Sequence, residues 1–271
     1  MKGFETMKKV CILLIALLAA AGLEARNVYV IRHGQVGIPI KELKEPRLTE
    51  LGVRQARAAA EYLTGKLKFA GTIYASPLYR TIETAKPTAE LLKKKIILEP
   101  GIQELATGPV PTPPGMTLRQ VETYFPDLTV PGPRFADGWR LCKENAEMRR
   151  VRIEKALDAI LAEEKGDLLL TGHGASVNDL VRALNGKRAP GVGKIAGTAW
   201  NCALFIFELN DRNEVTGGRY TTEYLDDRDV TNNFRCPKIE RSDDPKYMTR
   251  AQEKEYWIKR RAKEKAGEKK P

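Results

Sequence analysis

The stretch NVYVIRHGQ, residues 27–35, runs from an apolar segment into a histidine that is followed by glycine. The stretch DLLLTGHG, residues 167–174, has the same pattern of an apolar run followed by histidine and glycine. Short apolar runs bounded by glycine are typical of buried strands. In open sheets of parallel strands, ligands bind just beyond the carboxyl ends of the strands. The two stretches therefore predict an α/β fold in which His33 and His173, the two histidines of the chain, meet at one edge of the sheet.

Strand-like and helical patterns alternate through the rest of the chain. Thr49 is expected to cap a helix, and Pro87 is expected to kink the next one. Strands that alternate with helices favour a three-layer α/β/α architecture with a mostly parallel central sheet. Besides the strands at 27–31 and 167–171, we expect strands at residues 72–75, 96–98 and 203–209, and helices at about 49–63, 77–92, 144–162 and 175–184.

Composition places the chain among globular proteins. Its 271 residues are 42% hydrophobic and 30% charged, which excludes a mostly disordered, collagenous or multi-span membrane protein and allows one large domain or two small ones. Lysine and arginine number 46 against 35 aspartate and glutamate, a net charge of +11. We therefore expect anionic partners, above all a small phosphorylated substrate.

Much of the positive charge lies in the last part of the chain. Residues 250–271 contain nine Lys or Arg and four Glu. We expect residues 241–271 to form a charged basic tail that contacts an anionic envelope or membrane surface, and we expect no specific nucleic-acid partner. The alternative is a solvated helix without any partner.

The first residues have the pattern of a targeting segment. Lys8 and Lys9 precede an apolar run at residues 10–18, which alanines follow. This order is typical of a secretory signal peptide, and we expect it to cover residues 1–25, with cleavage after Ala21 or Ala25. The folded domain would then be 26–240, secreted or periplasmic. A retained membrane anchor is the alternative, but the apolar run is short for a span.

The cysteines give no sign of a metal site. Removal of the leader would leave Cys142, Cys202 and Cys236, which allow at most one internal disulfide and lack the spacing of metal ligands. We therefore expect no metal and no other cofactor.

Two arginines accompany the histidines. Arg32 precedes His33, and Arg80 lies in SPLYR, just after the strand at 72–75. Guanidinium groups bind phosphoryl oxygens in a bidentate manner. Either arginine alone would be an ordinary surface charge, but together with two histidines at one sheet edge they predict a phosphate pocket.

Four motifs together resemble the histidine phosphatase superfamily, and more narrowly its phosphoglycerate-mutase-like branch, branch 1. They are VYVIRHGQ, then LTELG followed by QA, then YASPLYRTIETA, then LLLTGHGASV. They occur in the family's order, and the resemblance extends from about residue 28 to 209. It implies the three-layer fold expected above.

The resemblance also implies roles for single residues. His33 would attack phosphorus and carry a transient phosphohistidine, while His173 and the two arginines would hold the phosphoryl oxygens. By its place in IQEL, Glu104 would serve as general acid and then general base. Glu83 and Glu122 are the alternatives to Glu104; Gly34, Gln35 and Thr107 complete the set expected to line the pocket.

Departures from the family pattern favour a phosphatase over a mutase. Mutases of the family carry an Asn and a Phe-x-Gly-Trp stretch after the first motif and a Tyr-Gly pair after the catalytic Glu. Here these places hold VGIPI, residues 36–40, and LATG, residues 105–108. A secretory leader also argues against a glycolytic mutase. We expect a metal-independent phosphomonoesterase; a phosphotransferase and a non-catalytic phosphate- or anionic-polymer-binding relative remain as alternatives.

The leaving group is expected to be selected by two loops over the pocket. One is the proline-rich stretch at residues 107–114, and the other is the stretch at 132–139. Loops of this kind run over the surface. Their sequences do not identify the alcohol of the substrate.

Overall fold

A computed structural model describes residues 25–40, 45–105, 116–135 and 144–231, together with 255, 258 and 259. The predicted leader up to residue 24, the proline-rich loop at 107–114 and almost all of the basic tail lie outside the described residues. Among the described residues, no helix combines the length and the apolar composition that crossing a bilayer requires.

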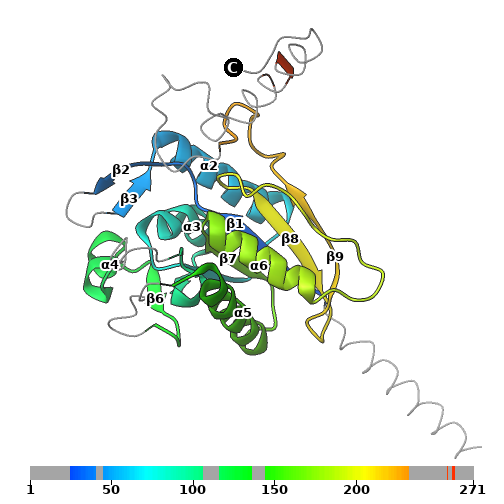
Figure 1. Cartoon of the computed structure of the whole chain (residues 1–271). Coiled ribbons are helices and arrows are strands. Elements are labelled where there is room, and N and C mark those ends of the chain that lie inside the picture. The colour runs from blue at the N-terminus through cyan, green and yellow to red at the C-terminus, as the bar shows by residue number, and fades with distance from the viewer. Residues whose placement is uncertain are drawn as a thin grey trace, which may run out of the picture.

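Seven strands of the described chain form one sheet in the order β6-β5-β4-β7-β1-β8-β9 (Figure 1). The strands from β6 to β1 are parallel to their neighbours, whereas β8 is antiparallel to β1 and β9 is antiparallel to β8. The predicted mostly parallel sheet is therefore confirmed. The bounds are β1 Arg26–Arg32, β4 Thr72–Ala75, β5 Ile96–Leu98, β6 Thr129–Pro131, β7 Leu168–Gly172, β8 Leu204–Leu209 and β9 Val215–Thr221.

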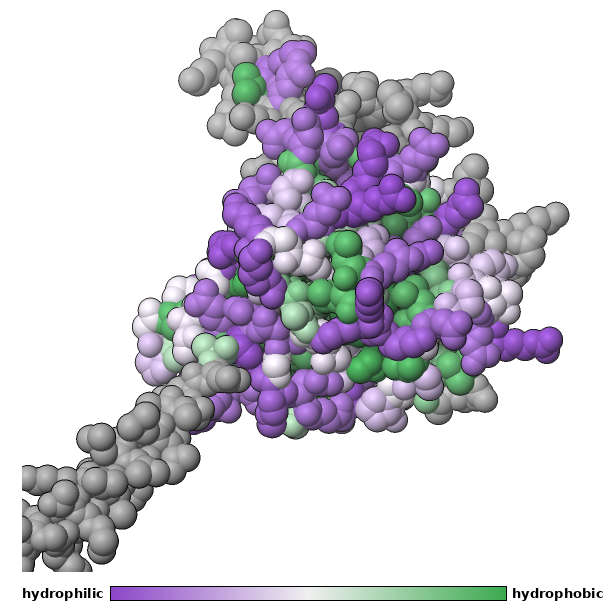
Figure 2. Space-filling view, turned by 180° about the vertical axis from the view of Figure 1, so that it is seen from behind, coloured by the Kyte–Doolittle hydropathy of each residue, from purple (hydrophilic) through white to green (hydrophobic). Residues whose placement is uncertain are grey.

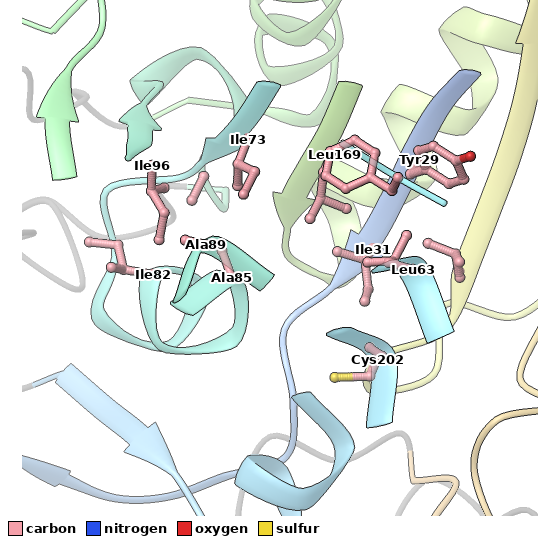
Figure 3. Close-up of a cluster of buried hydrophobic side chains, with 14 of the residues drawn as sticks. Tyr29, Ile31, Leu63, Ile73, Ile82, Ala85, Ala89, Ile96, Leu169 and Cys202 are labelled. Atoms are coloured by element: carbon pink, nitrogen blue, oxygen red, sulfur yellow. The ribbon is translucent and has the colours of Figure 1, made fainter. Parts of the chain in front are cut away.

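Helices cover both faces of this sheet and make the three predicted layers. Side chains alternate between the faces of a strand, so that Tyr29 and Ile31 of β1 pack with one group of helices and Val28 and Val30 with the other. The first group, drawn in Figure 3, is α2 (Glu50–Glu61) and α3 (Tyr79–Leu92); the second is α5 (Ala146–Glu163) and α6 (Gly174–Gly186).

Local signals explain where these helices begin. The Thr49 hydroxyl accepts the N–H of Gly52, as a helix cap does. Asn145 caps α5 in the same way through the N–H of Met148, so this helix starts two residues later than predicted. The helix predicted from residue 77 also starts later, at Tyr79, and it continues through Pro87. After α2, the chain adds a π-helical turn, Tyr62–Lys66.

Several elements were not predicted, most of them short. The most important is a hairpin of β2 (Val36–Ile40) and β3 (Glu45–Leu48), which forms a separate small sheet beside α2 in Figure 1. Both strands contain proline, which lowers the strand signal of a sequence. The others are the 3-10 turn η2 (Pro100–Ile102), α4 (Leu118–Tyr124), β6 and β9.

The surface opposite to the view of Figure 1 carries hydrophilic side chains around a central hydrophobic area (Figure 2). Large apolar side chains that are exposed among the described residues include Leu91, Val130, Met148 and Val151. They come from different elements, α3, β6 and α5. Scattered exposed apolar residues of this kind are normal for a folded protein.

Candidate active site

The parallel pairing of β1 with β7 brings the two histidines together. Arg32 is paired in register with Gly172, and the N–H of His33 donates to the carbonyl of Gly172 at 2.9 Å. The ring centres of His33 and His173 are 5.4 Å apart, and both residues are completely buried. The predicted meeting of the histidines at the carboxyl edge of the sheet is what the structure shows.

The hydrogen bond of the His33 ring defines its tautomer. Nδ1 lies 2.7 Å from the carbonyl oxygen of Gly34. Because a carbonyl oxygen can only accept, Nδ1 carries the proton and the lone pair of the neutral ring is on Nε2. Burial, then Arg80 and Arg32, hold the pKa of His33 well below its ordinary value of 6.5. The imidazole is thus neutral at physiological pH, the form that a nucleophile needs.

His173 is the N-cap residue of α6. Its Nε2 lies 2.8 Å from the hydroxyl oxygen of Ser76, whereas its buried Nδ1 has no hydrogen-bond partner among the described residues. Burial and the charge of Arg80 hold the pKa of His173 well below 6.5. One ring nitrogen is therefore oriented by the protein and the other is available to a ligand.

Gly34 allows the turn after His33 to pass close to α2. A Cβ at this position would lie 2.6 Å from the backbone oxygen of Gly52, a distance that real Cβ atoms do not show. The N–H of Gly34 donates to the hydroxyl of Thr84 at 3.0 Å. The glycine after the histidine is thus required by packing, and its predicted phosphate contact stays a prediction.

Arg32 and Arg80 are both 4% exposed. The Nη1 of Arg32 donates to the carbonyl of Ala199 at 2.7 Å, and burial lowers its pKa to about 10. The guanidinium of Arg80 reaches no acceptor among the described residues, and its Nε is buried without a partner. Burial also lowers the pKa of Arg80. A buried cation in this condition is ready to bind an anion.

Glu104 is the carboxylate that acts on both arginines. It is half-buried and follows η2, and its charge raises the pKa of Arg32 and of Arg80 against the effect of burial. Its Oε1 accepts the N–H of Leu105 at 2.9 Å. Arg152 of α5 donates to the carbonyl of Gly101 at 2.8 Å and so fixes the turn before Glu104.

The two alternative carboxylates lie elsewhere. Glu83 of α3 accepts the N–H of Leu48 at 2.6 Å, which ties it to β3. Glu122 is exposed on α4. Neither appears among the charges that act on Arg32 or Arg80, whereas Glu104 acts on both arginines. Glu104 is therefore the best placed of the three.

The remaining predicted positions are placed only in part. The side-chain oxygen of Gln35 accepts the hydroxyl of Thr49 at 2.9 Å, so Gln35 holds the start of α2, and its phosphate contact stays a prediction. Thr107 lies outside the described residues. Of the second predicted loop, the structure describes 132–135, where Arg134 pairs with Glu99 at 2.5 Å and with Glu163 at 2.7 Å.

The structure adds residues that sequence reasoning missed. Ser76 orients His173, and it lies just after a strand, as both histidines do. Asn201 donates to the backbone oxygen of His33 at 3.0 Å and accepts the hydroxyl of Thr231 at 2.9 Å, a long-range contact for which the sequence has no signal. A third residue, Glu45, lies beside Arg80 and is described below.

The described residues offer neither a metal-ligand cluster nor a disulfide. Within the described part of the chain, no three His, Cys, Asp or Glu side chains gather as a metal site would require. Cys202 is a buried free thiol, and Cys142 and Cys236 lie outside the described residues.

Residues 28–217 match the model of the histidine phosphatase superfamily (branch 1). A Yersinia enterocolitica protein named "Probable phosphoglycerate mutase GpmB" is 30% identical over 169 residues, which are 59% of this chain and 75% of that protein. The transcription factor tau 55 kDa subunit of Saccharomyces cerevisiae is 32% identical over 116 residues, 38% of this chain but only 26% of that protein. The crystal structure of the ecdysone phosphate phosphatase from Bombix mori, in complex with tungstate, superposes with a TM-score of 0.53 at 19% identity, covering 74% of this chain and 93% of that one. This last match concerns the fold.

Proposed function

This chain belongs to branch 1 of the histidine phosphatase superfamily, and from that premise we propose that it is a phosphomonoesterase with His33 as nucleophile. The observation that carries the proposal is the guanidinium of Arg80, which is 4% exposed and has no acceptor among the described residues. A buried charged group that lacks hydrogen-bond partners destabilises a fold. The oxygens of a phosphoryl group would supply the missing acceptors and add negative charge to that of Glu45 and Glu104, which act on Arg80 against the effect of burial.

The first step is transfer of the phosphoryl group to His33. The lone pair on Nε2 attacks phosphorus, an N–P bond forms, and the bond from phosphorus to the ester oxygen breaks. Glu104, as the carboxylic acid, gives its proton to the leaving oxygen, which departs as an alcohol. Arg32, Arg80 and the Nδ1 side of His173 bind the equatorial oxygens, whose charge rearranges in the transition state.

The second step returns the enzyme to its starting state. Glu104 is now a carboxylate and takes a proton from water as that water attacks phosphorus. The N–P bond breaks, inorganic phosphate forms, and the electron pair returns to Nε2 of His33. The same carboxyl group thus serves as acid and then as base, and no metal ion is used in either step. A chelator is therefore expected to leave turnover unchanged, and a loss of turnover in chelator would contradict this chemistry.

A phosphotransferase is the second candidate, and the 30% identical relative named as a probable phosphoglycerate mutase favours it. In that case the phosphohistidine would pass its phosphoryl group to a second alcohol instead of water. The sequences VGIPI and LATG, which stand where mutases of the family carry other residues, support hydrolysis. Release of inorganic phosphate in the presence of excess glycerate or another polyol distinguishes the two candidates.

The test is phosphate release from an aryl phosphate such as p-nitrophenyl phosphate by the parent protein and by His33→Ala. We expect turnover in the parent and a loss of roughly 10⁴-fold or more in the variant, with an unchanged melting temperature. A labelled substrate should also leave an acid-labile phosphoryl group on the parent and none on the variant.

Equal turnover in the folded variant would show that His33 is not the nucleophile. Negligible turnover in both proteins, together with phosphate binding in calorimetry, would instead identify a phosphate-binding relative.

A further inference from the structure

Glu45 is a completely buried carboxylate at the first position of β3. Its Oε2 accepts the N–H of Tyr79 at 2.6 Å, and Tyr79 is the first residue of α3. A carboxylate at a helix N-terminus binds a free N–H group and is favoured by the helix dipole. Because Arg80 is the next residue, Glu45 fixes the backbone that carries this arginine.

Glu45 and Arg80 are also each other's main counter-charge. Glu45 comes before Glu104 among the charges that raise the pKa of Arg80, and Arg80 is the charge that lowers the pKa of Glu45. Yet no ion pair or hydrogen bond joins the two side chains. Oε1 of Glu45 and Nε of Arg80 are both buried without a partner among the described residues. The two opposite charges attract each other without a direct contact, so that Oε1 of Glu45 lacks a donor and Nε of Arg80 lacks an acceptor.

This arrangement makes the ionised form of Glu45 unfavourable near neutral pH. Burial, the largest effect, raises the pKa of Glu45 to about 7, although Arg80 and the Tyr79 N–H act in the opposite direction. The carboxyl group therefore gains or loses its proton in the range in which the enzyme would work.

Among the charged groups on the elements around Glu45, Arg80 is the one that acts on its pKa. On α3, Glu83 is bound to the N–H of Leu48 and Lys86 is exposed. β2 contains no titratable residue. Residues 41–44 lie outside the described part of the chain. The other charged groups on β3 and α2 are all exposed: Arg47, Glu50, Arg54, Arg57 and Glu61. The titratable groups of the site either act on Arg80 or are acted on by it: Arg32, His33, Glu104 and His173.

Resting on the proposed function, we propose that Glu45 is a positioning residue that couples binding of a phosphoryl dianion at Arg80 to uptake of one proton. In the empty site, ionised Glu45 is the counter-charge that orients Arg80. A bound dianion replaces it in that role and repels a second negative charge, so Glu45 takes a proton from the solvent. By linkage, a ligand that favours the protonated form binds more tightly when that form is already present.

The sign of the pH dependence follows from this coupling. Below pH 7 Glu45 is already protonated, and the dianion binds without any proton uptake. Above pH 7 the dianion must first draw a proton into the site, so its affinity falls. From pH 6 to pH 8 the expected loss is about tenfold for one linked proton. The histidines do not produce this effect because burial and the arginines hold their pKa values well below 6.5.

The experiment is calorimetric titration of the full chain with sulfate at pH 6, 7 and 8. Sulfate is a dianion throughout this range, whereas phosphate itself titrates. Each titration is run in two buffers that differ in ionisation enthalpy, which gives the number of protons taken up. The parent should lose about tenfold in affinity over the range and take up protons at pH 8.

Two variants test the assignment to Glu45. Glu45→Gln keeps an oxygen for the N–H of Tyr79 but cannot ionise, so it should bind sulfate at pH 8 as tightly as the parent does at pH 6, without proton uptake. Glu83→Gln is the matched control, because it too removes a partly buried carboxylate of known backbone contact from this region. It should behave as the parent does.

The outcomes separate this inference from the proposed function. A parent that takes up no proton, or a Glu45→Gln protein that keeps the pH dependence of the parent, overturns the role of Glu45 and leaves the phosphate site intact. If Arg80→Ala binds sulfate as well as the parent does, the phosphate site is wrong, and the inference fails with it. A purely structural role would lower the melting temperature of Glu45→Gln and change neither proton uptake nor its pH dependence.

Discussion

Arg80 on α3 and Arg149 on α5 are both buried, 4% and 8% exposed, on opposite faces of the same sheet. Arg149 donates from Nε to Asp179 at 2.6 Å, and this contact joins α5 to α6. Arg80 reaches no acceptor among the described residues. Burial is therefore common to both, and only the partner distinguishes them.

If the proposed function is right, this difference in partners separates a structural charge from a functional one. A buried ion pair with good geometry compensates most of the desolvation cost of its members. A buried cation without a partner keeps that cost, and the rest of the fold must offset it. On the proposed function, an anion bound at the carboxyl edge of the sheet would offset the desolvation cost of Arg80. Four substitutions test this distinction, from the largest expected effect to the smallest.

Arg80→Ala is expected to remove activity without loss of stability. Deletion of one preorganised donor to a developing oxyanion costs about 10² to 10³-fold in turnover, and for a buried guanidinium we expect the upper end, about a thousandfold. The melting temperature should stay the same or rise, because the variant lacks the buried guanidinium without an acceptor, and Glu45, which loses its counter-charge, can take up a proton instead. Turnover of an aryl phosphate and thermal unfolding measure the two effects. A variant that is active but unstable would place Arg80 with the structural charges.

Arg149→Ala is expected to show the reverse. It leaves Asp179, 4% exposed, as a buried carboxylate without its main partner, a change that costs roughly 3 to 5 kcal/mol. Arg150 and Arg182 are 3.9 and 3.5 Å from the same carboxylate and should limit the loss. Activity per folded molecule should be unchanged. Denaturant unfolding gives the free energy; a stable variant with reduced turnover would link α5 to the site instead.

Sequence reasoning could place Arg80 but not distinguish it from Arg149. The motif after β4 and the two matched histidines predicted the carboxyl edge, because each depends on a local pattern that ends a strand. Whether a charge has a partner depends on contacts between residues far apart in the chain: Arg149 and Asp179 are 30 positions apart, and Asn201 and His33 are 168 apart. No local pattern encodes such pairs.

The same reason explains which parts of the fold were missed. The five predicted strands and four predicted helices have long or strongly apolar patterns and are present within a few residues of the predicted ends. The hairpin β2–β3 contains two prolines and has a weak strand pattern in the sequence. Its two segments become strands because they pair with each other. Glu45 lies on that hairpin, so its place beside Arg80 could not be predicted without it.

Glu104→Gln is expected to have a smaller effect, which depends on the substrate. With an alkyl phosphate, whose leaving oxygen needs a proton, turnover should fall about a hundredfold. With p-nitrophenyl phosphate, whose leaving group is stable as an anion, formation of the phosphohistidine should be nearly unchanged. Glu83→Gln is the control, because Glu83 contacts the backbone of β3; it should leave the turnover of both substrates unchanged. Equal losses in the rate of phosphohistidine formation from the two substrates would mean that Glu104 contributes charge alone and not a proton to the first step.

Ser76→Ala should have the smallest effect, about tenfold in turnover, because it removes no group that touches phosphorus. The Ser76 hydroxyl lies 2.8 Å from Nε2 of His173, and without it the ring loses the contact that directs Nδ1 toward the phosphoryl oxygens. The matched control is Thr81→Val in the same turn, whose buried hydroxyl donates to the backbone oxygens of Ser76 and Leu78 and touches neither histidine. The control should lower the melting temperature and leave turnover unchanged, whereas Ser76→Ala should lower turnover with little change in melting temperature. If Ser76→Ala instead lowers the melting temperature and leaves turnover unchanged, as the control does, then the position of His173 at the start of α6 is enough to orient its ring. The hydrogen bond from Ser76 would then contribute to stability alone, like the ion pair of Arg149.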